Sequence, residues 1–154
     1  MSATPTEQPE FTIWPDLASR ALAGSVIWAS DEAFAERENL IAAHEPGFDP
    51  DEFGNKGKVY DGWETRRRRH DEIGGHDSAI VRLGVPGQIK GIVVDTAWFK
   101  GNFPTQIAVH GLTCDEYLPA EEIAALPDSA WTTLVPVSDA KGDHKHYFEV
   151  FPAG

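Results

Sequence analysis

The pattern of apolar and polar positions predicts a chain made mainly of β-strands. The segment 106–112 (QIAVHGL) alternates apolar and polar residues, as a half-buried strand does. Several strands separated by turns, with little helix, predict an antiparallel β-sandwich or jelly roll. Short helices are expected at 17–22, after Asp31 and at 121–126. The expected strands cover 25–30, 78–83, 89–96, 106–112, 131–137 and 146–151.

Two stretches show neither the helical nor the strand period and are expected to be loops. Residues 45–58 are rich in Pro, Gly, Asp and Asn, which favour turns. Residues 61–77 read DGWETRRRRHDEIGGHD. Because long loops inside compact domains are usually functional, we expect this second loop to carry a binding site. Residues 1–10 are expected to form a flexible arm, and residues 11–154 a single domain.

The charge of the chain narrows its expected partners. Asp and Glu outnumber Lys and Arg by 25 to 13, which gives a formal net charge of −12. Such a surface repels phosphate backbones and anionic lipids, so neither nucleic acid nor a membrane is an expected partner. The single cysteine, Cys114, allows no intrachain disulfide. Residues 1–10 lack the basic and apolar regions typical of a signal peptide, and no apolar run reaches the length that spans a bilayer, so neither is expected. A soluble, cytoplasmic protein is therefore expected.

Four of the 13 basic residues stand side by side at positions 66–69. A guanidinium offers a planar fork that binds a carboxylate through two parallel hydrogen bonds. Successive loop side chains point in different directions, so we expect one or two of these arginines to face a small anionic ligand. The alternative is a solvated basic turn that is neutralised by Asp71 and Glu72.

Acidic residues in loops or at strand ends are candidates for proton transfer and for orienting hydrogen-bond donors. They are Asp61, Glu64, Asp77 and Asp95. Each could instead form a turn or cap an element. Asp95 differs from the others because it follows the apolar run at 92–94, which places a carboxylate at the end of a strand.

Histidine and tryptophan residues leave further alternatives open. His144 and His146 are two positions apart, so on a strand they would share a face and could bind a metal ion. Without a third ligand, a polar strand end is the competing interpretation. Trp63 and Trp98 are either core residues or platforms on which a ligand stacks. Residues 100–102 (Lys-Gly-Asn) are typical of a tight turn.

Three runs of sequence together resemble the allantoicase (allantoate amidinohydrolase) family. They are DGWETRRRR at 61–69, GHD at 75–77 and IVRLGVPGQIKGIVVDTAWFKGNFP at 80–104. The resemblance implies a galactose-binding-like jelly roll. It also implies hydrolysis of allantoate to ureidoglycolate and urea, a step of purine degradation in which allantoate is the small-molecule substrate.

The resemblance supplies a set of candidate site residues without fixing the role of each. The arginines suit the carboxylate of allantoate, and the acids suit its ureido N–H groups. A divalent metal ion could polarise the leaving carbonyl, but no ligand set in the sequence demands one, and no cofactor is assigned. The candidate catalytic residues are Asp61, Glu64, His76, Asp77 and Asp95. The candidate substrate-binding residues are Trp63, Thr65, Arg66, Arg67, Arg68, Thr96, Lys100 and Asn102.

The resemblance also bears on assembly. Members of the family usually carry two such repeats in a longer chain, whereas this sequence holds one. We expect this repeat to lack its last strands, and the chain to form a homo-oligomer or to associate with a second repeat. Two hypotheses compete with catalysis: a module that only binds a carbohydrate or another small ligand, and a structural repeat of a larger allantoicase.

Overall fold

The β-strands of the protein form antiparallel pairs. The protein is described by a computed structural model that covers residues 8–49, 51, 53–54, 57–58, 61–65 and 76–151. The strands are β1 Ser25–Ala29, β2 Phe53–Gly54, β3 Gly57–Lys58, β4 Ala79–Arg82, β5 Gly91–Asp95, β6 Gln106–Gly111, β7 Thr132–Asp139 and β8 Lys145–Glu149. β1 pairs with β4, β5 with β8, β6 with β7, and β2 with β3. The six predicted strands are all present, and the mainly β, antiparallel fold is confirmed.

Helices within the described residues are short. The predicted helix at 121–126 is present as α1, Ala120–Ala124. The segment 17–22 is helical only in its last part, Arg20–Leu22, and the left-handed conformation of Ala23 (φ 66°) ends that turn. The 3₁₀-helices span Glu10–Ile13, Arg20–Leu22, Arg37–Ile41 and Asp128–Ala130.

Two local predictions were wrong. No helix begins directly after Asp31, because its carboxylate accepts a hydrogen bond from the Ala33 N–H (2.7 Å) and closes a turn instead. The 3₁₀-helix in this region begins only at Arg37. Residues 45–58 are not loop throughout, since they contain the short β2–β3 hairpin.

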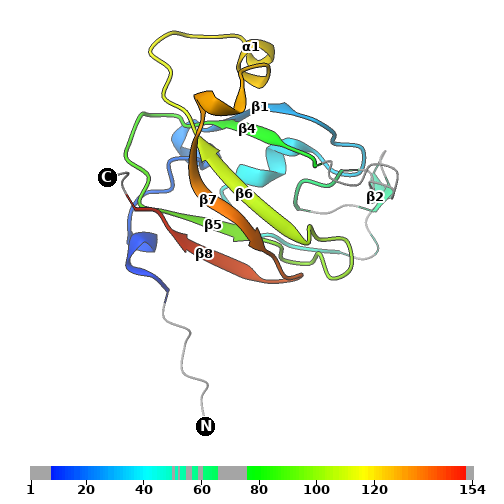
Figure 1. The fold of residues 1–154 in the computed structure, drawn as a ribbon. Helices are drawn as coiled ribbons and strands as arrows, with labels where there is room; N and C mark the ends of the chain where they lie inside the picture. The colour runs from blue at the N-terminus through cyan, green and yellow to red at the C-terminus, as the bar shows by residue number, and fades with distance from the viewer. Residues whose placement is uncertain are drawn as a thin grey trace.

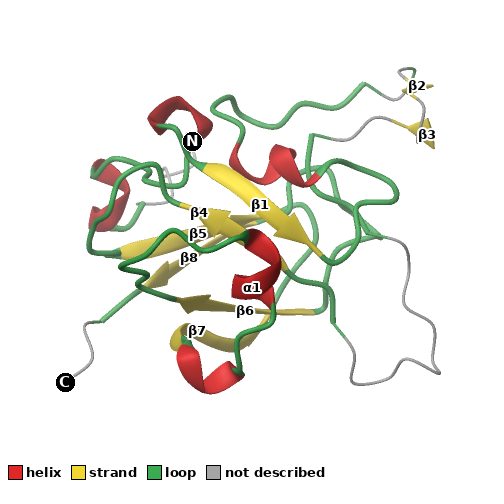
Figure 2. Ribbon diagram, turned by 90° about the horizontal axis from the view of Figure 1, so that it is seen from above, coloured by secondary structure: helices red, strands yellow, loops and turns green. Residues whose placement is uncertain are grey.

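Because of the directions of the strands, several of the segments that connect them lie at one end of the molecule. β5 and β8 form a regular ladder in which Asp95, at the end of β5, lies opposite Lys145, at the start of β8. In β1 and β4 the corresponding residues are Ala29 and Ala79. β1 and β5 both point to the right in Figure 1, and the view in Figure 2 agrees. The segments that follow β1 and β5 and precede β4 and β8 therefore meet at this end.

The buried apolar side chains come from several elements. Val26 of β1 and Val135 of β7 are the most deeply buried of them, at 1% and 2% exposed. Further buried apolar side chains, among them Ile41, Phe99 and Ile123, come from a 3₁₀-helix, a loop and α1. Because Phe99 belongs to the connection after β5, that connection is anchored in the core and is positioned by it.

Candidate active site

The connection after β5 is fixed by a buried threonine. Thr96 is 5% exposed. Its hydroxyl donates to the Lys141 carbonyl (2.6 Å) and accepts from the His144 N–H (3.1 Å). Its own N–H donates to the His144 carbonyl (3.0 Å). These bonds occupy the hydroxyl within the fold, so Thr96, a predicted substrate-binding residue, holds the end of β5 against the segment before β8.

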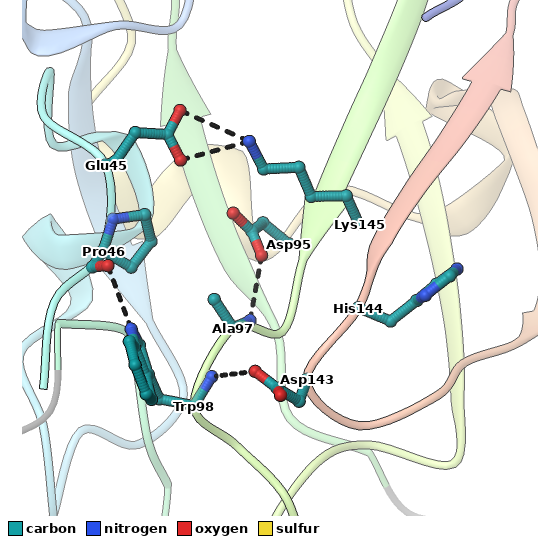
Figure 3. A pocket seen from close by; sticks show the side chains of 8 residues that line it. All are labelled: Glu45, Pro46, Asp95, Ala97, Trp98, Asp143, His144 and Lys145. Carbon is teal, nitrogen blue, oxygen red and sulfur yellow. Dashed lines mark hydrogen bonds and ion pairs between the residues drawn. The ribbon is translucent and has the colours of Figure 1, made fainter. Parts of the chain in front are cut away.

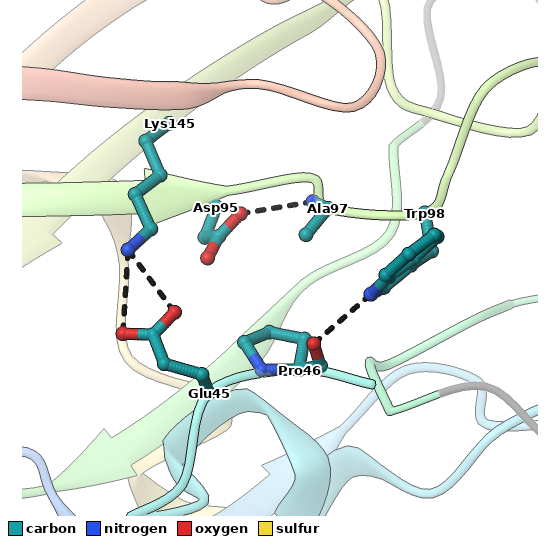
Figure 4. Close-up of polar contacts among 6 residues, drawn as sticks. All are labelled: Glu45, Pro46, Asp95, Ala97, Trp98 and Lys145. Atoms are coloured by element: carbon teal, nitrogen blue, oxygen red, sulfur yellow. Dashed lines mark hydrogen bonds and ion pairs between the residues drawn. The ribbon is translucent and has the colours of Figure 1, made fainter. Parts of the chain in front are cut away.

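Asp95 lies beside this anchor and is exposed. One carboxylate oxygen accepts a hydrogen bond from the Ala97 N–H (2.9 Å), which closes a turn and sets the direction of the side chain. The other oxygen points toward the space between Lys145 and Pro46 (Figure 4). The prediction of a carboxylate at a strand end is therefore confirmed, and the strand end borders a pocket.

Trp98 has a strained backbone that its neighbours hold in place. Its φ is 70°, a conformation that costs a non-glycine residue on the order of 1–3 kcal/mol. Its N–H donates to Asp143 Oδ1 (2.8 Å), and its indole Nε1–H donates to the Pro46 carbonyl (2.9 Å). The indole also stacks on Phe48, with 6.0 Å between ring centroids. Trp98 is 41% exposed, so it is a wall of the site rather than a core residue.

These groups surround an open pocket of about 230 Å³ between the end of β5, the start of β8 and the segment around Pro46 (Figure 3). Its charged side chains are three carboxylates and one ammonium group. A ligand in this pocket would therefore find several hydrogen-bond acceptors beside an aromatic wall. The lining residues are Glu45, Pro46, Asp95, Ala97, Trp98, Asp143, His144 and Lys145.

An ion pair closes one side of the pocket (Figure 4). Lys145 Nζ lies 3.1 Å and 3.3 Å from the two carboxylate oxygens of Glu45. The hydrogen bond to Glu45 raises the pKa of Lys145 above its ordinary value of 10.5. Desolvation acts in the opposite direction, and the charges of Glu45 and Asp95 add to the increase. Lys145 is therefore cationic at neutral pH.

The two neighbouring histidines have different surroundings. His146 is 9% exposed, and its Nε2 accepts a hydrogen bond from the Lys141 N–H (2.8 Å). The other ring nitrogen, Nδ1, therefore carries the proton and donates to the Val94 carbonyl (2.9 Å). Both nitrogens are occupied by the main chain, which leaves none for a metal ion. His144 is exposed and borders the pocket.

The segment 61–65 is held by neighbouring loops. Asp61 Oδ2 accepts from the Gly47 N–H (2.9 Å), and the Trp63 indole donates to the Asp31 carbonyl (2.6 Å). The main chain of Glu64 pairs with Ala35. Gly62 lies so close to Phe99 that an added Cβ would sit 2.4 Å from the ring atom Cε2. These contacts bring 61–65 against the connection after β5.

Two further sets of predicted residues can be placed. The Asn102 amide donates to Glu64 Oε1 (2.8 Å), so the two predicted segments meet directly. Asp77 Oδ1 accepts from the Ser30 hydroxyl (2.8 Å) at the end of β1, one residue from the carbonyl that binds Trp63. His76 and Lys100 are exposed, and Thr65 is half-buried. Arg66, Arg67 and Arg68 lie outside the described residues.

The sequence did not identify several pocket residues. Glu45 and Pro46 belong to a stretch that was assigned as loop on composition, and Asp143 and Lys145 carried no motif. They reach the pocket only through contacts between distant segments, such as the one between Glu45 and Lys145, 100 residues apart. Trp98 was singled out as either a core residue or a stacking platform, and its place in the pocket wall agrees with the second alternative.

Residues 15–153 match the family model described as Allantoicase repeat. The chain belongs to the allantoicase repeat family. A protein of Nocardia farcinica named probable allantoicase is 52% identical over 140 residues, which cover 91% of this chain. A probable allantoicase of Streptomyces avermitilis is 47% identical over 147 residues, which also cover 91% of it. The resemblance that the three sequence runs suggested is therefore confirmed.

Solved structures agree with the family. A structure of allantoicase superposes on the repeat with a TM-score of 0.70 at 32% identity, and the match covers 87% of this chain and 38% of that one. The crystal structure of allantoicase from Saccharomyces cerevisiae gives 0.66 at 33% identity, over 88% and 38%. This chain spans 41% of the length of the Nocardia relative and 39% of the length of the Streptomyces relative. Among the described residues, no helix has the length and apolarity that crossing a membrane requires.

Proposed function

We propose that this chain is a repeat of an enzyme that hydrolyses allantoate to ureidoglycolate and urea. Membership of the allantoicase repeat family supports the reaction. The structural observation that supports the location is the meeting of predicted segments at one end of the sheet, where Asn102 bonds to Glu64 and Asp95 borders a pocket. This meeting of predicted segments supports the proposal that a small polar substrate binds at this end of the sheet.

The reaction assigns separate tasks to these groups. Water adds its oxygen to the central carbon of allantoate, the bond from that carbon to one ureido nitrogen breaks, and that nitrogen takes up a proton as urea leaves. We propose that Asp95 and Glu64 accept hydrogen bonds from ureido N–H groups, and that His76 or Asp77 transfers the proton. Correctly placed general acid–base groups contribute about 10²–10⁴-fold in rate.

The remaining predicted residues are assigned to substrate binding. The carboxylate of allantoate suits Arg66, Arg67 or Arg68, because a guanidinium binds it through two parallel hydrogen bonds. Lys100 is exposed close to Asn102 and adds positive charge. Trp63 and Thr65 border the same segment, although the indole N–H of Trp63 is already bonded to Asp31.

The described residues supply no complete ligand set for a metal ion. Among the residues that the structure covers, no three His, Cys, Asp or Glu side chains come together as ligands. We therefore assign no step to a divalent ion, and the proton transfers above depend on side chains of this chain.

We further propose that the repeat acts in the cytoplasm, in association with a second repeat or a second copy of this chain. Large apolar side chains on its surface support an association. Val137 is 68% exposed, Phe151 is 78% exposed and Tyr117 is 83% exposed. Such side chains are common at interfaces between proteins.

Release of urea from allantoate tests the proposed function. The purified chain and a tandem of two copies would each be incubated with allantoate, and urea would be quantified. We expect urea, and we expect Asp95→Asn to lower kcat/KM by about 10-fold or more, because a bound ureido N–H loses a charged acceptor. Asp115→Asn, an exposed acid outside the site, is the matched control. Absence of urea from both wild-type forms would contradict the proposal.

A further inference from the structure

Residues 44–48 form a strap between the two halves of the proposed site. One side of the strap contacts Asp61, and the other contacts Trp98. Within it, the Gly47 N–H and the Pro46 carbonyl point to opposite partners: the first donates to Asp61 Oδ2 (2.9 Å) and the second accepts from Trp98 Nε1 (2.9 Å). The strap therefore joins the segment 61–65 to the connection after β5.

Asp61 makes two contacts with the strap through one oxygen. Besides accepting from Gly47, its Oδ2 lies 3.4 Å from His44 Nε2. The carboxylate is 37% exposed. This oxygen faces a main-chain N–H, and Asp61, unlike Asp95, is not among the residues that line the pocket. Its geometry is that of a hydrogen-bond acceptor that holds a loop.

The other side of the strap forms part of the pocket wall. Glu45 and Pro46 both line the pocket (Figure 3), and Phe48 stacks on the Trp98 ring. Glu45 is fixed by its ion pair with Lys145 of β8. A change in the position of Gly47 would move the neighbouring Pro46 and Glu45, and with them one wall of the pocket.

We infer that Asp61 is a positioning residue, whose carboxylate fixes the strap 44–48 against Trp98 and so shapes the pocket beside Asp95. The inference rests on the proposed function for its effect on turnover. It replaces the direct catalytic role that the sequence resemblance suggested for Asp61. What the site requires at this position is an acceptor for the Gly47 N–H, and the negative charge is secondary.

Two substitutions separate positioning from proton transfer. In Asp61→Asn the amide oxygen can still accept from Gly47, whereas in Asp61→Ala the acceptor is lost. We expect Asp61→Asn to keep kcat within about threefold of wild type. We expect Asp61→Ala to raise KM by about tenfold, the size of effect that one lost hydrogen bond produces. If both variants lose kcat equally, by 10²-fold or more, Asp61 transfers a proton and the inference is overturned.

Hydrogen exchange tests the strap without substrate. We expect the Gly47 amide to exchange about tenfold faster in Asp61→Ala than in wild type, and at nearly the wild-type rate in Asp61→Asn. Asp115→Ala is the matched control and should leave this amide unchanged. An unchanged Gly47 exchange rate in Asp61→Ala would overturn the inference whatever the activity. If exchange responds as expected but no variant and no wild-type form releases urea, the strap stands and the proposed function fails.

Discussion

Residues 95–102 and residues 61–65 carry most of the described site candidates, and different contacts hold the two segments. The first continues directly from β5 and is fastened by the buried hydroxyl of Thr96 and by the core residue Phe99. Among the described residues, the only strand-like pairing of the second segment is the bridge between Glu64 and Ala35. It is positioned by single hydrogen bonds to loops and by a close approach to Phe99.

This difference separates side chains that a paired strand holds in position from side chains whose position depends on contacts with neighbouring loops. Asp95 is positioned by a paired strand, so local loosening of a loop should leave it in place. The carboxylates of Asp61 and Glu64 are positioned by hydrogen bonds from the loop residues Gly47 and Asn102. Substitutions near β5 should therefore lower the stability of the whole fold, whereas substitutions near 61–65 should act more locally.

Removing the Thr96 hydroxyl should have the largest effect on stability. Thr96→Val keeps the shape of the side chain but removes the two hydrogen bonds of its buried hydroxyl, to the Lys141 carbonyl and the His144 N–H, so we expect the free energy of unfolding to fall by about 2–3 kcal/mol. Urea denaturation measures the change. Thr133→Val, on the exposed face of β7, should change it by less than about 0.5 kcal/mol. Equal free energies of unfolding for the two variants would contradict the role of Thr96 in holding the end of β5 against the segment before β8.

Filling the contact between Gly62 and Phe99 should have an intermediate effect. In Gly62→Ala the new Cβ would lie 2.4 Å from the Phe99 ring, so one of the two segments has to shift, at a cost of about 1–2 kcal/mol. Gly101→Ala is the control, because nothing lies within 4 Å of its added Cβ. We expect thermal unfolding to show a lower Tm for Gly62→Ala alone. A Tm equal to that of Gly101→Ala would contradict the close approach.

The ion pair between Lys145 and Glu45 should contribute least, and its contribution should depend on pH. Because the pKa of Lys145 in the folded chain is raised above 10.5, the stabilisation is fully present below pH 10.5 and is lost as pH rises through the folded-state pKa. Both side chains are partly exposed, so it amounts to about 0–1 kcal/mol. Unfolding of wild type and Lys145→Met, compared from pH 7 to 11.5, should show a difference that shrinks at the alkaline end. If the stability difference between wild type and Lys145→Met grows toward pH 11.5, the raised pKa of Lys145 in the folded chain is contradicted.

The sequence predicted the parts of this molecule that depend on local pattern. The strand at 89–96 was predicted from its apolar run, and so was the carboxylate of Asp95 at its end. The contact between Trp98 and Pro46 and the place of Glu45 in the pocket wall were not predicted, because they depend on contacts between loops that periodicity does not encode. The histidine pair shows the same limit: spacing placed His144 and His146 together, but only the structure shows that His146 is bonded to the main chain of Val94 and Lys141.

The most direct test of the account is to map allantoate on the chain by amide chemical shifts. We predict that titration with allantoate shifts the amides of residues 44–48, 61–65, 95–102 and 143–145 in the ¹⁵N-labelled protein, and leaves those of α1 and of the β6–β7 pair unchanged. Such a result would locate the ligand at the end of the molecule where the predicted segments meet. Shifts confined to α1 or to β6 and β7 would contradict the central claim.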